Sequence, residues 1–232
     1  QTASLTGLSD PTLTQITGFR PRGGAMANGT FLDLDTVTIE VNTGTPPPTT
    51  LILEEGFEAG TQPFAGSGNT PVAVAVPDAR AGSYVMKSQL TPDSTDPERT
   101  EVTLNQSQWN FDVDAEYWVG ISIKLDNDFN DGRTFNDQGM LAQWHYRDFD
   151  YSDGYKPQPL MIRFNGDNVI VEHEFIDGSG TEQKTTFATL PPAYGQWVDW
   201  VVRVKFSDTA GIFQVWRNGT LVVDQVGIDN HL

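Results

Sequence analysis

The chain has 232 residues, a formal net charge of −17 and no cysteine. Its hydrophobic content of 38%, with 11% aromatic residues, is enough for a packed core and argues against general disorder. The charge argues against binding to nucleic acid or to an anionic membrane surface. The lack of cysteine excludes disulfides, thiolate metal sites and a cysteine nucleophile. No stretch reaches the roughly 20 apolar residues of a membrane span.

The first 50 residues differ in composition from the rest. Residues 1–30 are rich in Thr, Gly, Ser and Pro and show little periodicity. Residues 31–42 alternate apolar and polar side chains, which predicts a strand, and a change of phase near Asp35 predicts a bulge or bend. A run of prolines in residues 43–50 predicts a stiff linker. We therefore expect an N-terminal arm (1–42), a linker (43–50) and a main domain (51–232).

The main domain shows strand patterns with turn signals between them and no helical stripe of useful length. Two pairs of strands flank short Asn-Gly-containing segments, at 165–168 and 217–219, which predict hairpins. Many strands without alternating helices predict an all-β sandwich or barrel. The expected strands are 117–125, 160–164, 169–175, 197–206, 212–216 and 220–226.

Two strand-like segments carry polar residues two positions apart. Arg99 and Glu101 share one face of the first segment, and Gln143 and His145 share one face of the second, because side chains alternate along a strand. Such pairs occur as cross-strand salt bridges on a solvent face or as satisfied polar pairs. Together they also offer a guanidinium and an amide for a carboxylate, so they predict a site for a sugar carboxylate.

Three further motifs accompany these segments. They are Gly-Phe-Glu-Ala-Gly at 56–60, Gly-Gln-Trp-Val-Asp at 195–199 and Gly-Ile-Phe-Gln-Val-Trp-Arg-Asn-Gly at 211–219. In order and spacing, from about residue 51 to the end, the motifs resemble those of the heparin-lyase-I-like and glucuronan-lyase-like polysaccharide lyases, a group related to one family of alginate lyases. The resemblance implies a β-jelly roll of two curved antiparallel sheets with an acidic, uronate-containing polysaccharide in the concave face.

The reaction that this resemblance implies is β-elimination at a uronic acid, with no required cofactor. A base removes the proton at C5 and the 4-linked glycosidic oxygen leaves. Donors must neutralise the neighbouring carboxylate and stabilise the developing charge, a role that the resemblance assigns to Arg99 and Gln143. It assigns the base to His145, whose usual pKa lies near operating pH. Glu101 is expected to orient Arg99.

The chain departs from this group in one respect. Its relatives carry a later Lys-x-Gly-x-Tyr strand whose tyrosine acts as acid or base, and no such sequence occurs in these 232 residues. Tyr151, in a loop that could fold over a cleft, is the expected substitute, with Tyr155 as a substrate-binding residue. Tyr146 is a weaker candidate for substrate binding because it follows His145 directly and should point to the opposite face.

Two other functions remain open from the sequence. A jelly roll without its last strand has an exposed edge, and the strand at 31–42 could fill that gap in its own domain or in a neighbouring molecule. The second arrangement would make the protein a structural subunit of an extracellular filament with an inactive lyase-like fold. The third reading is a plain carbohydrate-binding module.

Weaker signals concern metal binding, a histidine and location. Asp126 and Asp128 are spaced like calcium ligands and suggest a structural calcium ion, against the alternative of a solvated acidic loop. His173 alternates with Val171, so it should share the core face and is a second-choice partner for the uronate. We expect a secreted, processed protein, because the chain does not begin with Met and because it carries N-glycosylation sequons at Asn28, Asn105 and Asn218.

Overall fold

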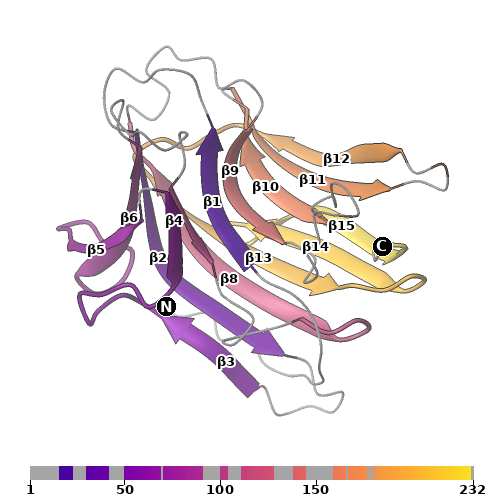
Figure 1. Cartoon of the computed structure of the whole chain (residues 1–232), viewed down its shortest axis with the longest axis horizontal. Coiled ribbons are helices and arrows are strands. Elements are labelled where there is room, and N and C mark those ends of the chain that lie inside the picture. The colour runs from indigo at the N-terminus through magenta and orange to yellow at the C-terminus, as the bar shows by residue number, and fades with distance from the viewer. Residues whose placement is uncertain are drawn as a thin grey trace.

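The computed structural model is a sandwich of two antiparallel sheets, as the jelly-roll prediction requires. It describes residues 16–22, 30–41, 50–68, 70–90, 100–103, 111–127, 138–144, 159–165, 167–176, 179 and 181–230. One sheet has seven strands in the order β12-β11-β10-β9-β1-β7-β4, and the other has eight in the order β15-β14-β13-β8-β2-β6-β5, with β3 paired to β2 (Figure 1). None of the described segments is a helix able to span a membrane.

The strands of the seven-stranded sheet are β1 (Ile16–Arg22), β4 (Ala65–Gly68), β7 (Thr100–Thr103), β9 (Gln138–Trp144), β10 (Leu160–Phe164), β11 (Val169–Ile176) and β12 (Glu182–Leu190). Those of the eight-stranded sheet are β2 (Thr30–Val41), β5 (Val72–Ala75), β6 (Tyr84–Leu90), β8 (Glu116–Leu125), β13 (Trp197–Lys205), β14 (Gly211–Arg217) and β15 (Thr220–Ile228), joined at one side by β3 (Thr50–Glu55).

Alternating side chains of the two sheets build one core. In β8 and β13 every second residue is buried, and the buried set includes Tyr117, Val119 and Val202. The residues between them point away from the core, as strand geometry requires. Both predicted hairpins are confirmed, because β10 pairs with β11 and β14 pairs with β15 across their short turns.

The N-terminal residues contribute one strand to each sheet. The predicted strand at 31–42 is present as β2, and the predicted bulge is confirmed by a register shift between Asp35 and Val37 in its pairing with β8. β2 pairs with β8 on one side and β6 on the other within its own chain. The sequence did not predict β1, which lies beside β9 (Figure 1) and pairs with β7 on its other side. Most of the predicted linker lies outside the described residues, and the domain boundary at residue 50 stays a prediction.

Two of the motif segments hold loops in place. The Glu58 carboxylate accepts hydrogen bonds from the backbone N–H groups of Ser83 and Tyr84, at 2.9 Å each to Oε1. On the outside of the eight-stranded sheet, Asp199 accepts two hydrogen bonds from Arg80, at 3.0 and 2.8 Å. These two motif residues therefore have structural roles that attach the segment before β6 to the sandwich.

Candidate functional site

Glu101 lies on the face of the seven-stranded sheet that points away from the core. Its neighbours on β7 point the other way, since Thr100 shares a hydrogen bond of 2.9 Å with Ser88 of the opposite sheet and Val102 belongs to the core. Alternation then places Glu101 on the outer face, where it is 3% exposed.

Gln143 occupies the same outer face on β9. Ala142 and Trp144 on either side of it belong to the core. The register confirms the shared face, because Thr17 of β1 is the partner of both Thr103 and Gln143, and paired residues lie on one side of a sheet. The strands of Glu101 and Gln143 are therefore separated by β1, a lateral distance of about 10 Å.

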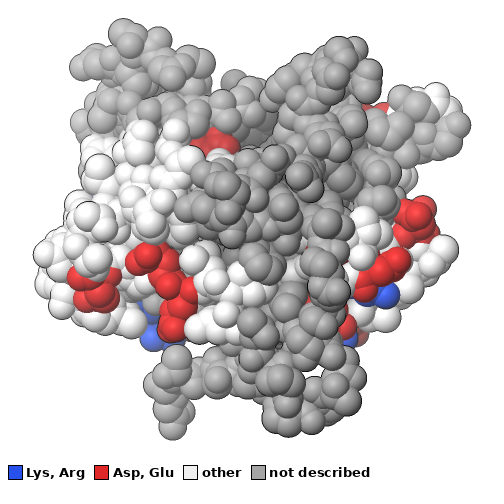
Figure 2. Space-filling view, turned by 60° about the horizontal axis from the view of Figure 1, so that its bottom comes forward, with Lys and Arg blue, Asp and Glu red and all other residues white. Residues whose placement is uncertain are grey.

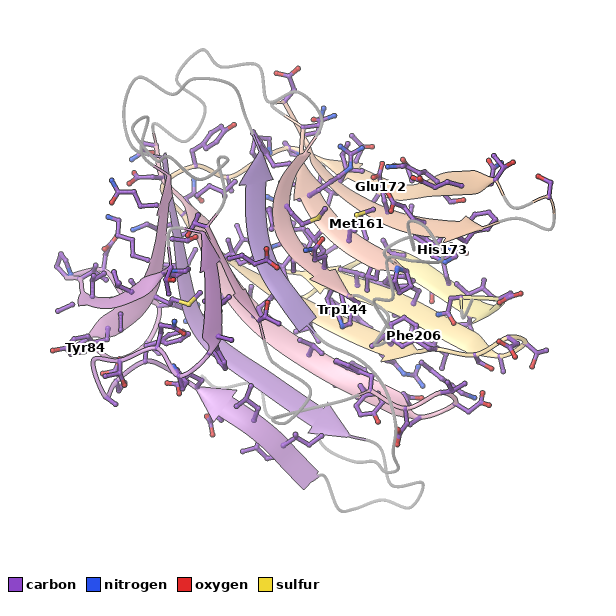
Figure 3. The ribbon with its side chains drawn as sticks, viewed as in Figure 1. Tyr84, Trp144, Met161, Glu172, His173 and Phe206 are labelled. Carbon is purple, nitrogen blue, oxygen red and sulfur yellow. The ribbon has the colours of Figure 1, made fainter. Side chains whose placement is uncertain are left out.

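The side chain of Gln143 is nearly buried, at 3% exposure, yet it makes no hydrogen bond with any described residue. Its neighbour on β10 is Met161, which is 2% exposed and is in turn paired with Glu172 of β11. Figure 3 shows Met161 and Glu172 on these adjacent strands. An amide without a partner among the described residues has both a donor and an acceptor to offer a ligand.

Ion pairs cover the same face beyond Gln143. Arg163 binds both carboxylate oxygens of Glu172, with Nη2 at 2.8 Å from Oε1, and Thr186 donates to the same oxygen at 3.1 Å. Burial alone would raise the pKa of Glu172, but the hydrogen bonds and charge of Arg163 outweigh it and hold that pKa below its usual range. Lys184 pairs with one carboxylate oxygen of the buried Glu174.

Sequence reasoning did not select Arg163 or Lys184. The sequence did contain an indication of these ion pairs. Glu172 and Glu174 alternate on one strand, and Arg163 and Lys184 lie on the strands that precede and follow it in the sequence. Which cation meets which carboxylate depends on the register of three strands, and a register shift between Val171 and Glu172 in the pairing of β11 with β12 places Lys184 opposite Glu174.

His173 shares the core face, as predicted from its alternation with Val171, and is therefore not brought together with Gln143. Its ring stacks on Phe175 at 5.2 Å and on Phe187 at 6.1 Å, and Phe187 contacts Phe213 of the opposite sheet. The buried Nε2 of His173 has no hydrogen-bond partner among the described residues. In this position it does not contact a ligand on the outer face.

We expect His173 to make the protein less stable at mildly acidic pH. Burial lowers the pKa of His173, and the charges of Asp229 and Glu174 offset this only in part. The unfolded chain therefore binds the proton more tightly, and stability falls as the pH drops below about 6.5. Urea unfolding from pH 8 to pH 5 should show a stability difference between wild type and His173→Phe that moves in favour of the variant as the pH falls. Equal pH dependence in the two proteins would contradict this.

Several predicted residues lie outside the described part of the chain. Asp126 is described, and its Oδ1 accepts the N–H of Asn127 at 2.7 Å. No group of three potential metal ligands occurs among the described residues, and the calcium ion stays a prediction. Asn218 is exposed at the β14–β15 turn. The predicted residues that are not described are Arg99, His145, Tyr146, Tyr151, Tyr155, Asp128, Asn28 and Asn105.

The comparison with known families decides the broad identity. The profile described as "Polysaccharide lyase" matches residues 50–232. The chain belongs to the polysaccharide lyase family. No curated protein and no solved structure matches it. The lyase region therefore runs from β3 to β15, and β1 lies before it. The strand between Glu101 and Gln143 thus comes from outside the matched region. The heparin-lyase-like and glucuronan-lyase-like grouping stays a prediction.

Proposed function

We propose that this lyase-family protein binds a uronate-containing polysaccharide on the outer face of the seven-stranded sheet and cleaves it by β-elimination. The observation that carries the proposal is the Gln143 amide, which is nearly buried and unpaired among the described residues on the face that also holds Glu101. Burying a polar group without a partner costs free energy, so such a group is a good candidate for ligand contact.

In this proposal four residues divide the chemistry. Arg99 and Gln143 bind the uronate carboxylate and stabilise the negative charge that develops when the C5 proton leaves. His145 removes that proton, and Tyr151 donates a proton to the leaving oxygen. Glu101 orients Arg99. Of these residues, Gln143 and Glu101 are the two whose positions the structure describes.

The ion pairs of this face remove a repulsion that would oppose an anionic ligand in a protein of charge −17, and in this proposal Arg99 supplies the attractive charge. An isolated buried carboxylate would repel a uronate, but Arg163 and Lys184 neutralise Glu172 and Glu174. On the described surface in Figure 2, carboxylate groups cover more area than cations do. The attraction for a polyanion must therefore come from cations within the site itself. A polymeric substrate also places the protein outside the cell in this proposal.

The test incubates the protein with glucuronan, alginate, ulvan and heparin. Release of unsaturated uronate is measured by its ultraviolet absorbance. Wild type should act on at least one polymer. Gln143→Ala should lower kcat by about 10²- to 10³-fold, the usual effect of removing one donor to a developing oxyanion, and His145→Ala should abolish turnover. Gln196→Ala is the matched control, because this exposed glutamine lies in the connection before β13.

The result that overturns the proposal is an absence of turnover by wild type on all four polymers. Affinity electrophoresis in the same polymers then separates the remaining readings. Retarded migration that Gln143→Ala abolishes would identify a binding module without turnover. A filament subunit stays a prediction, and the pairing of β2 with β6 and β8 in its own chain does not favour it.

A further inference from the structure

The outer face of the eight-stranded sheet carries two tryptophans that the core does not use. Trp118 of β8 and Trp216 of β14 alternate with buried residues and point away from the other sheet. Their rings stack with centroids 5.3 Å apart and planes 24° from parallel. β13 lies between their strands, with Val201 at the position paired to Trp216 (Figure 1). The two half-buried rings thus form one aromatic surface across three strands.

Polar side chains beside these rings are held in fixed positions. The Arg203 guanidinium lies 5.5 Å from the Trp118 ring centre and binds Glu116 through Nε and Nη2, at 2.8 and 2.6 Å. Its Nη1 donates to Gln214 Oε1 at 2.9 Å, and Gln214 Nε2 donates to Asp224 at 2.6 Å. Arg203 is therefore neutralised by Glu116 while it keeps further N–H groups for a ligand.

The apolar surface continues to the edge of the sheet. Leu221 of β15 is paired with Trp216 and is 42% exposed, and Val226 on the same strand is 62% exposed. The opposite side of these strands is already filled by core residues such as Val215 and Val223. An apolar patch of this kind, rimmed by polar residues, is typical of an interaction site.

We propose that this surface, formed by Trp118, Trp216, Arg203, Gln214 and Leu221 and here called the tryptophan platform, is a second glycan-binding site for an uncharged stretch of polysaccharide. The C–H face of a pyranose ring packs on an aromatic face, and its hydroxyls hydrogen-bond to planar polar groups such as Arg203 and Gln214. A polyanion would need an unpaired cation, and the cation of this platform is already paired with Glu116. Charge complementarity therefore selects a neutral sugar.

The tryptophan platform is separate from the site proposed for β-elimination. The two lie on the outer faces of different sheets, on opposite sides of the core. The inference uses the family assignment, which makes a polysaccharide the expected polymer, but it does not depend on turnover. Such a site would hold the protein on a mixed polymer while the other face acts on acidic segments.

Affinity electrophoresis and calorimetry test the platform with hydroxyethylcellulose, glucomannan, xylan and a soluble β-1,3-glucan. Wild type should bind at least one of them. Trp216→Ala should weaken that binding about tenfold or more, as loss of a stacking surface predicts. Trp216→Phe, which keeps a ring, should stay within about threefold of wild type. Val72→Ala, a change at an exposed position of β5, should leave binding unchanged.

Two further variants distinguish a loss of binding at the tryptophan platform from a loss of folding and from an effect at the proposed β-elimination site. Leu221→Asp places a charge at an exposed position and should weaken the same binding without affecting the melting temperature. Gln143→Ala should bind the neutral polymer like wild type. The proposal is overturned if wild type binds none of the neutral polymers, if it binds only alginate or heparin, or if folded Trp216→Ala binds as well as wild type.

Discussion

Arg163→Met is expected to lower the free energy of unfolding by about 3–5 kcal/mol, the usual cost of leaving one partner of a buried ion pair alone. Glu172 has 5% of its side chain exposed and Arg163 has 15%, so water cannot replace the guanidinium. The variant keeps the length and the apolar stem of the side chain, and its effect therefore reports on charge. Urea unfolding at pH 7 measures it.

The pH dependence identifies the cause. In wild type the lowered pKa of Glu172 contributes stability above the unfolded value of about 4.3, and this contribution is lost as the pH falls through the folded value. In Arg163→Met the carboxyl lacks its partner and binds a proton more readily, so the deficit should shrink from pH 7 towards pH 5.

Further variants distinguish the contribution of the Arg163–Glu172 pair to stability from that of the neighbouring Lys184–Glu174 pair. Replacing both partners, in Arg163→Met with Glu172→Met, should recover most of the loss. Lys184→Met also leaves a buried carboxylate, that of Glu174, without its lysine, so it should destabilise the protein too, but by less than Arg163→Met because 47% of the Lys184 side chain is exposed to water. A double variant as unstable as Arg163→Met alone would show that the loss comes from packing.

Trp144→Ala is expected to cost about 3–5 kcal/mol, the range for removing a large aromatic side chain from a core. Trp144 is 0% exposed and is among the largest fully buried side chains of the described residues. Its indole N–H has no hydrogen-bond partner among the residues that the structure describes, so Trp144→Phe, which removes that group and part of the volume, should cost clearly less. Urea unfolding of the three proteins at pH 7 measures the series.

The neighbouring residue supplies the control. Gln143→Ala should change the free energy of unfolding by about 1 kcal/mol or less, because the amide makes no hydrogen bond with a described residue. Of these two adjacent residues, Trp144 would thus affect stability and Gln143 would affect ligand binding. Equal destabilisation by Gln143→Ala and Trp144→Ala would contradict the placement of these side chains on opposite faces.

Much of the fold was predictable because its signals are local. The alternation at 117–125, the turn residues at 165–168 and the phase change near Asp35 each depend on neighbouring residues, and each is present in the structure. β1 was missed because Ile16–Arg22 lacks regular alternation. It forms through pairing with β9 and β7, which are distant along the chain, as the pairing of Thr17 with Thr103 shows.

The candidate site was predictable in part for the same reason. A period of two is enough to put Gln143 and Trp144 on opposite faces, and to give His173 the face of Val171. It does not say which face of the sheet meets the core or which strand lies alongside. Predicting the ion pair of Arg163 and Glu172 would have required knowing both the face and the neighbouring strand.

By itself the sequence determined the all-β class, the strand faces, the two hairpins and the likeness to polysaccharide lyases, because these are properties of short segments and of their order. Only the tertiary structure decided that β1 separates Glu101 from Gln143, that His173 stacks in the core between Phe175 and Phe187, and that Trp118 and Trp216 meet across β13. These facts depend on the register and order of strands distant in sequence. Register and order are set by packing of the whole sandwich, not by the pattern within any one strand.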